Sequence, residues 1–211
     1  LKAIYGVDTM PQTAENVAKQ FNIDRADQDQ FALASQQRTA TAQAQGFFTH
    51  EIIPVNIPQR KGDPIVVDTD EHPRASTTLE GLTKLQPVVT AEGTVTAGNA
   101  SGINDGAAAV LIASEAAIEQ YQLKPRAKII ASTAVGVEPR IMGFAPAPAI
   151  KKLLKQANLT LEQMDVIELN EAFAAQALAV TRDLGLADDT TQVNPNGGAI
   201  AIGHPLGASG A

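Results

Sequence analysis

The last third of the chain alternates between short apolar runs and helix-like segments. The expected order is strand, helix, strand, helix, strand, at residues 127–134, 146–157, 166–169, 172–184 and 192–194. Proline in the first turn of the segment 146–157 favours a helix there. Alternation of this kind predicts a layered α/β sheet with helices packed on its faces, and one more helix is expected to begin at Gly207.

The polar N-terminal part of the chain predicts two helices with recognisable ends. Thr13 is expected to cap a helix that extends to Gln20, because a threonine hydroxyl can accept a free N–H of the first turn. Asp24 is expected to begin a longer helix, with Asp27 as a capping partner three residues on. Gly46 is expected to end that helix, since glycine adopts the left-handed conformation that helix C-termini favour.

The middle of the chain predicts a hairpin and then a buried strand. Turn residues separate the β-rich runs 51–57 and 64–68, so these runs are expected to pair, with a short helix over 79–85 after them. The small apolar residues 108–113 predict a buried strand, followed by a helix over 114–121. The chain thus divides into three zones, at residues 1–101, 102–123 and 124–211.

Composition narrows the range of partners. The net charge is -7, which argues against binding to nucleic acid or to an anionic membrane surface. No apolar run reaches the roughly 20 residues of a membrane helix. The chain has no cysteine, so it holds no disulfide and no thiolate metal site, and we expect no bound metal.

A glycine-rich stretch at residues 194–210 contains His204 between a strand and a helix. Glycine permits positive φ and close backbone approach, and Pro205 restricts the backbone after the histidine. A histidine held in such a turn can face a pocket, and its near-neutral pKa suits proton transfer. The alternative is a histidine whose ring is merely satisfied by neighbouring backbone groups.

Asn170 lies where the strand 166–169 ends and the next helix begins. Ligand chemistry in open α/β sheets concentrates at the carboxyl ends of strands. The amide of Asn170 could donate to a developing oxyanion, directly or through water. It could equally cap the following helix through its side-chain oxygen, and the residues alone leave both interpretations open.

Four blocks of the sequence, in order, resemble those of the thiolase family. Residues 168–176 are similar to its asparagine–glutamate–alanine–phenylalanine box, and residues 203–205 to its glycine–histidine–proline box. Residues 93–107 resemble its junction between loop and core, and residues 13–18 a helix of its CoA-binding loop domain. Ketoacyl synthases share the glycine–histidine box, but not the other blocks.

The resemblance implies an incomplete thiolase-like layered α/β sheet fold with an α+β loop domain. Residues 1–101 would form the CoA-binding loop domain, 102–123 the end of the N-terminal half-domain, and 124–211 a truncated C-terminal half-domain. Family members act on CoA thioesters and hold no permanently bound cofactor, so CoA is expected as a substrate. The complete protein is expected to be a cytoplasmic homodimer or homotetramer, with acyl-CoA and CoA as its partners.

The resemblance also assigns roles to residues of this chain. His204 would deprotonate a nucleophilic cysteine, and Asn170 would hold a water that forms an oxyanion hole with His204. Other residues would line the substrate path: Ser101 and Ala97 beside the pantetheine, Met10, Met142, Ala172 and Phe173 around the thioester, and Arg74 near the nucleotide. Alternatively, Met10 and Met142 are core residues, Ser101 caps a turn and Arg74 is a solvated charge. His50 and His72 are expected at the surface.

Two departures from the family pattern stand out. Ala145 replaces a glycine that the family usually has near Met142, which could alter that loop. Both cysteines of the family are absent from the chain, and we expect the nucleophile before Leu1 and the acid/base cysteine after Ala211. The 211-residue chain by itself is therefore expected to show no thiolase turnover.

The segment Thr9-Met10-Pro11 bears on the substrate. Acetoacetyl-CoA thiolases tend to have His-Met-Gly before the helix of the first block, whereas Thr-Met-Pro resembles thiolases that act on 3-oxoadipyl-CoA in aromatic degradation. We therefore expect cleavage of 3-oxoadipyl-CoA into succinyl-CoA and acetyl-CoA through an acyl-cysteine. The alternatives are a general acetyl-CoA acetyltransferase or β-oxidation thiolase, and a non-catalytic CoA-binding module.

Overall fold

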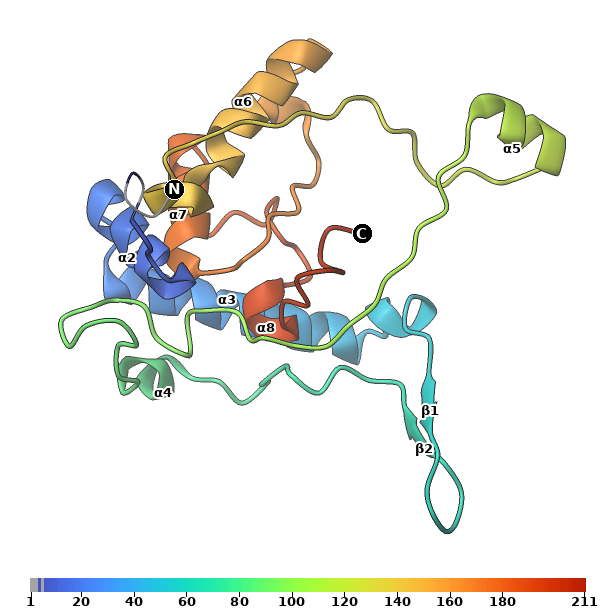
Figure 1. Cartoon of the computed structure of the whole chain (residues 1–211), viewed down its shortest axis with the longest axis horizontal. Helices are drawn as coiled ribbons and strands as arrows, with labels where there is room; N and C mark the ends of the chain where they lie inside the picture. The colour runs from blue at the N-terminus through green and yellow to red at the C-terminus, as the bar shows by residue number, and fades with distance from the viewer. Residues whose placement is uncertain (1–3, 5) are drawn as a thin grey trace.

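A group of packed helices forms the core of the molecule in the computed structural model, which describes residue 4 and residues 6–211 (Figure 1). Helix α7 (Ala174–Asp183) is in the middle. Helix α2 (Met10–Phe21) and the 3-10 helix η2 (Pro139–Phe144) pack against each other and against α7. Helix α3 (Arg25–Ala44) contacts α7 as well. It also contacts the short helices α4 (Leu79–Thr83) and α8 (Ala199–Ile202).

The burial of α7 follows from its small side chains. Every residue from Ala174 to Thr181 is buried. Alanines on several sides of the helix let neighbouring segments approach closely, while Leu178 and Val180 fill the remaining space. Phe31 of α3 packs against all three groups of buried apolar residues, so α3 and α7 share one core.

The first two helices begin as helix-capping chemistry requires, with one correction. Helix α2 starts at Met10, and its cap is Thr9, whose hydroxyl accepts from the Gln12 N–H at 3.4 Å. Thr13 was the wrong cap: it is buried inside α2 and donates to the Met10 carbonyl at 2.7 Å. Thr9 is followed by Pro11 in the first turn of the helix, which favours a helix start at that position. Thr13 lies on the buried face of the helix and is therefore a poorer cap.

Helix α3 confirms the predicted start at Asp24, whose carboxylate accepts from the Asp27 N–H at 2.8 Å. Asp27 does not return the bond as a capping box would, because its own carboxylate pairs with Arg182 of α7 at 2.5 Å. Beyond the cap at Gln45, Gly46 has φ +69° and allows the chain to leave the helix, as expected.

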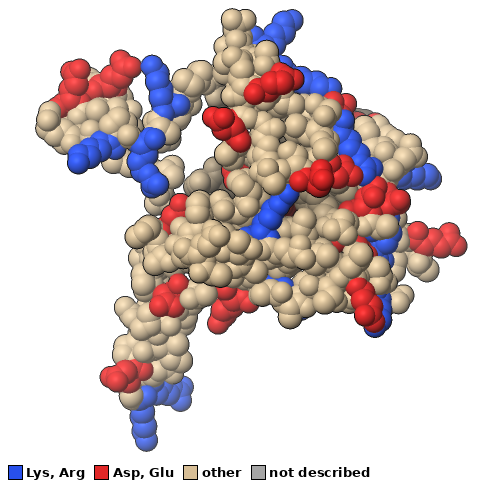
Figure 2. All heavy atoms as spheres, turned by 180° about the vertical axis from the view of Figure 1, so that it is seen from behind, with Lys and Arg blue, Asp and Glu red and all other residues tan. Residues whose placement is uncertain are grey.

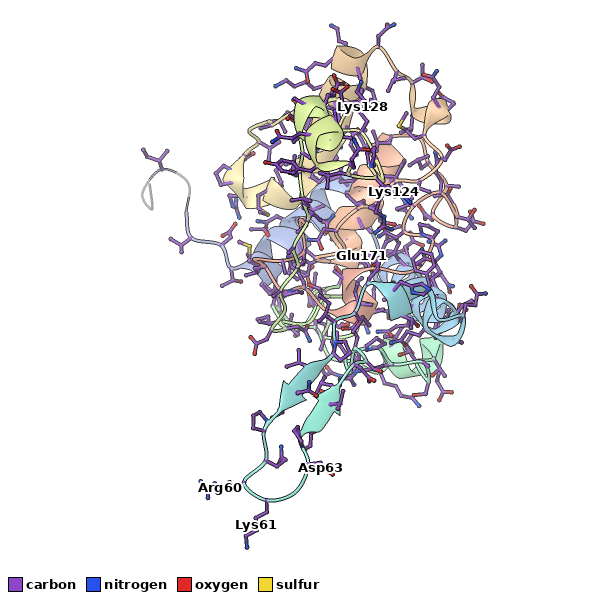
Figure 3. All side chains as sticks on the ribbon, turned by 90° about the vertical axis from the view of Figure 1, so that its right-hand side faces the viewer. Arg60, Lys61, Asp63, Lys124, Lys128 and Glu171 are labelled. Carbon is purple, nitrogen blue, oxygen red and sulfur yellow. The ribbon has the colours of Figure 1, made fainter. Side chains whose placement is uncertain are left out.

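The predicted hairpin is confirmed, and its strands are shorter than expected. Strand β1 (Val55–Ile57) pairs antiparallel with β2 (Ile65–Val67), and Ile57 faces Ile65. The hairpin follows the 3-10 helix η1 (Phe47–His50) and extends away from the helical core (Figure 1). Arg60 and Lys61 lie at its tip (Figure 3).

The helices over 114–121 and 146–157 are confirmed as α5 (Glu115–Tyr121) and α6 (Pro146–Ala157), with the 3-10 helix η3 (Leu161–Gln163) after them. The predicted helix at Gly207 is wrong, because the chain there makes only a turn.

Two predicted strands were also wrong. Residues 108–113 and 127–134 run on either side of α5 without strand pairing within the described part of the chain (Figure 1). Leu111 is 84% exposed and Ile129 is 71% exposed. Apolar side chains indicate a preference for burial, whereas a strand also needs a hydrogen-bonded neighbour. The strands expected at 166–169 and 192–194 are reduced to one parallel bridge between Ile167 and Val193.

Acidic and basic side chains are mixed over the face seen in Figure 2, where the hairpin ends in basic residues. Across residue 4 and residues 6–211, no helix combines the length and the apolar character needed to cross a membrane.

Candidate active site

His204 is held by its backbone on one side and by its ring on the other. Helix α8 ends at Ile202 and is followed by its C-cap Gly203, whose φ of +90° favours glycine, and a Cβ there would clash with the side chain of Asn104. The His204 N–H donates to the carbonyl of Gly102 at 3.0 Å. These constraints fix the point from which the half-buried imidazole extends.

The ring of His204 has a partner at each nitrogen. Nδ1 lies 2.8 Å from the hydroxyl of Ser209, and Nε2 lies 3.3 Å from Nδ2 of Asn170. Nδ2 of Asn170 can only donate, so Nε2 accepts in that contact and Nδ1 carries the ring proton, while the hydroxyl of Ser209 accepts from Nδ1 and donates to the Pro205 carbonyl at 3.1 Å. The network therefore assigns the neutral tautomer in which Nε2 carries a lone pair, as a general base requires.

Asn170 does not cap the following helix. The cap of α7 is Phe173, whose N–H donates to the side chain of Gln176 at 3.2 Å. The exposed amide of Asn170 instead points to His204, which excludes the capping interpretation and leaves the oxyanion role as a prediction. The expected approach of Asn170 and His204 to within one water is thus met by a direct contact.

The backbone before Asn170 is paired with a side chain. Asn194 accepts from the Leu169 N–H at 2.8 Å and donates to the Leu169 carbonyl at 2.8 Å, so it acts as a strand neighbour. Asn194 itself has φ +47°, a conformation that asparagine tolerates better than most residues. This pairing positions the turn that carries Asn170 against the segment that leads to His204.

Glu171 is buried directly behind that turn. Glu171 is only 1% exposed. Its carboxylate accepts hydrogen bonds from the side chains of Ser35 and Asn194 and from the Ile200 N–H. Burial raises the pKa of the Glu171 carboxyl, while these hydrogen bonds and the charge of Arg38 act in the opposite direction. Partial burial and the charge of Glu171 together raise the pKa of Glu168.

The four sequence blocks are joined by hydrogen bonds. The Ser101 N–H donates to the Ala172 carbonyl at 3.0 Å, and Gly102 accepts from His204. The carboxylate of Glu15, in the first block, accepts from the Thr94 and Val95 N–H groups at 2.7 Å each. Blocks that are far apart in sequence therefore form one connected unit around His204.

A cavity of about 730 Å³ borders Asn170 and the two neighbours of His204 in the chain, Gly203 and Pro205. Asn170, Ser209 and Asn104 line it, together with Glu168 and His72. Among the described residues, its lining does not include His204, Met10, Ser101 or Phe173. Backbone pairing directs the 99–102 segment toward α7 instead.

The remaining expected substrate residues are dispersed. Met10 is 51% exposed on α2 and Met142 48% exposed on η2, so neither is a plain core residue. Ala172 and Phe173 are half-buried and Ala97 is exposed. Arg74 is exposed beside a second hollow of about 630 Å³, which is formed by residues 71–77 and shares Glu71 and His72 with the first.

Sequence reasoning missed three residues near the pair. His72 was expected at the surface, yet it is half-buried, its Nε2 has no hydrogen-bond partner within the described residues, and its ring packs on Gly102. Asn104 lies in the block 93–107 and Ser209 in the glycine-rich stretch 194–210, and only their spatial contacts place them near the pair. His50 is exposed, as expected.

The chain matches the thiolase N-terminal domain over residues 1–116 and the thiolase C-terminal domain over residues 123–211. It therefore belongs to the thiolase family, which the four blocks predicted. The boundaries expected at residues 101 and 123 stay a prediction.

Among curated proteins, the chain is similar to enzymes named for one substrate. Over all 211 residues it is 83% identical to a beta-ketoadipyl-CoA thiolase of Acinetobacter baylyi and 60% identical to one of Pseudomonas aeruginosa. The chain spans 53% and 52% of those proteins, which is about half of their length.

Solved thiolase structures share the fold. The Bacillus anthracis acetyl-CoA acetyltransferase superposes with a TM-score of 0.91 at 44% identity, covering 96% of this chain and 50% of that one. Human mitochondrial 3-ketoacyl-CoA thiolase in complex with CoA gives 0.89 at 50% identity, covering 95% and 49%. The thiolase-like α/β fold is thereby confirmed, although the strands expected at 108–113 and 127–134 are unpaired among the residues described.

Proposed function

We propose that the complete protein carrying this chain is a thiolase that cleaves 3-oxoadipyl-CoA with CoA, giving succinyl-CoA and acetyl-CoA. The observation that carries this proposal is the contact between His204 Nε2 and Asn170 Nδ2, 3.3 Å apart in a chain of the thiolase family. Ser209 supports it by accepting from Nδ1 of His204, which leaves the lone pair of Nε2 for the contact with Asn170.

The proposed reaction has two steps. His204 takes the proton of a cysteine supplied by the rest of the protein, and the thiolate attacks the 3-oxo carbon of the substrate. The bond between carbons 2 and 3 breaks, acetyl-CoA leaves after protonation, and a succinyl group remains on the cysteine. The thiol of CoA then attacks this thioester, releasing succinyl-CoA and restoring the cysteine.

Asn170 and His204 are proposed to stabilise the developing oxyanion together. The amide N–H of Asn170 is a fixed donor, since the Leu169–Asn194 pairing holds its backbone. Once protonated, Nε2 of His204 becomes a second donor beside it. Loss of one such donor typically raises the barrier by about 3 to 4 kcal/mol.

The choice of substrate is supported by sequence similarity. Proteins named beta-ketoadipyl-CoA thiolase reach 83% identity to the chain, whereas an acetyl-CoA acetyltransferase of Allochromatium vinosum reaches 55%. Thr9 is exposed and its hydroxyl oxygen caps α2, which leaves its hydrogen free to donate to a longer acyl chain. The terminal carboxylate of that acyl chain still requires a cationic or multi-donor partner.

The remaining expectations belong to the same proposal. Ser101, Ala97 and Arg74 are proposed to follow the pantetheine and nucleotide of CoA. Met10, Met142, Ala172 and Phe173 are proposed to surround the thioester. We further propose a cytoplasmic homo-oligomer with CoA as a substrate and no permanently bound cofactor.

A comparison of two substrates tests the proposal. For the complete protein we expect kcat/KM to be higher for 3-oxoadipyl-CoA than for acetoacetyl-CoA. Equal values, or the reverse order, would indicate a general acetyltransferase, and no turnover with either would favour a CoA-binding module. The 211-residue chain by itself serves as the matched negative control, because it has no cysteine to acylate.

A further inference from the structure

A single buried carboxylate connects the two segments that carry Asn170 and His204. Oε2 of Glu171 accepts from the Ser35 hydroxyl at 2.6 Å and from the Ile200 N–H at 3.2 Å. Oε1 accepts from Nδ2 of Asn194 at 2.9 Å. In Figure 3, Glu171 lies in the middle of the molecule, far from the charged tip of the hairpin.

The connections of Glu171 lead directly to both members of the pair. Glu171 is adjacent in sequence to Asn170, so holding its side chain holds that turn. Its partner Ile200 belongs to α8, which ends at Ile202, two residues before His204. Asn194 also pairs with Leu169, so the carboxylate and the backbone of the turn share one partner.

The backbone around the carboxylate is fitted closely to it. Gly198 lies against Glu171, and a Cβ on Gly198 would stand 2.5 Å from the carboxyl carbon. Ser35 in addition accepts from the Gly198 N–H at 3.2 Å, so α3 holds the carboxylate and the glycine together. The Glu171 side chain, Gly198 and α3 are therefore packed closely against one another.

We propose that Glu171 is a positioning residue that sets the distance between Asn170 Nδ2 and His204 Nε2. It touches neither the substrate path nor the two reacting side chains, and it acts through the Asn170 turn and the start of α8. The catalytic consequence rests on the proposed function, whereas the geometric consequence does not.

Glutamine in place of Glu171 would test this with almost no change in shape. All three groups that contact the carboxylate are donors, and Ile200 N–H and Asn194 Nδ2 cannot become acceptors. The new amide nitrogen can replace Oε1, where it faces Nδ2 of Asn194, or Oε2, where it faces the Ile200 N–H. Either orientation sets donor against donor, so the turn or α8 must move.

The experiment compares E171Q with L178A in the complete protein. Leu178 is a buried residue of α7 with 1% exposure, and L178A supplies a loss of Tm without a change at the carboxylate. For E171Q we expect the distance between Asn170 Nδ2 and His204 Nε2 in a crystal structure to be longer than 3.3 Å. We also expect kcat to fall about 10²-fold while the KM for CoA stays unchanged. L178A at a comparable loss of Tm is expected to keep kcat within a few-fold.

Other outcomes separate the two proposals. An unchanged Nδ2–Nε2 distance in E171Q, or a kcat equal to that of L178A, would overturn the positioning role. A wild-type protein without turnover would instead remove the proposed function, while the distance measurement would still decide about Glu171. If E171Q does not fold, S35A removes only one of the donors, and it is expected to lower kcat in the same direction by a smaller factor. S35A with the kcat of L178A would also overturn the role.

Discussion

Replacing Asn194 with alanine removes the side chain that pairs with the backbone before Asn170. It eliminates two hydrogen bonds to Leu169 and one to Glu171, each between 2.8 and 2.9 Å. Neutral hydrogen bonds contribute about 1 kcal/mol each and a bond to a charged group about 1.5 to 3 kcal/mol, so together they account for about 4 kcal/mol. Because Asn194 has φ +47°, alanine adds a backbone penalty of about 1 kcal/mol.

Asn158 provides a matched control for the backbone penalty. It ends α6 with φ +54°, it is exposed, and its side chain makes no hydrogen bond among the described residues. Urea denaturation of N194A and N158A at one protein concentration, followed by circular dichroism, measures both losses. We expect N158A to lose about 1 kcal/mol and N194A about 5 kcal/mol. Equal losses would refute the view that Asn194 acts as a strand neighbour.

Two further predictions concern Glu171 and its surroundings. Gly198→Ala should lower Tm strongly, because its Cβ would meet the Glu171 carboxyl carbon, whereas Gly136→Ala should leave Tm unchanged, since nothing lies within 4 Å of a Cβ there. The pKa of Glu171 is raised by burial in the folded state, so the unfolded chain releases its proton first as pH rises through the ordinary value of 4.5. We therefore expect the free energy of unfolding of the wild type, measured between pH 4 and about 7, to decrease relative to that of E171Q as pH rises. Parallel curves for the two proteins would contradict a raised pKa of Glu171.

Helix positions followed from the sequence where local chemistry determines them. Pro146 in the first turn fixed the start of α6, and Asp24 fixed the start of α3, because both effects act within one helical turn. Thr13 was assigned wrongly because two threonines compete as caps, and only the packing of the Thr13 face against η2 and α7 decides between them. The strand at 108–113 failed because pairing depends on a neighbour that no local pattern specifies.

The candidate site was predictable as far as the family blocks extend. The boxes identified His204 and Asn170, and the structure brings the two side chains together. Ser209, Asn104 and His72 were not assigned, because their contacts arise from chain segments that meet only in the folded state. Glu171 lay inside a recognised box, but its role depends on partners 136 residues away in Ser35 and 23 residues away in Asn194.

The central proposal is that Nε2 of His204 is the base that activates the nucleophile of the complete protein. Rapid mixing of the complete protein with 3-oxoadipyl-CoA, with the acyl-enzyme detected by mass spectrometry, measures this step directly. We expect His204→Ala to slow acylation by about 10² to 10⁴-fold, and His50→Ala, at an exposed histidine of η1, to leave it unchanged. Acylation of the His204 variant at the rate of the His50 variant would contradict the account.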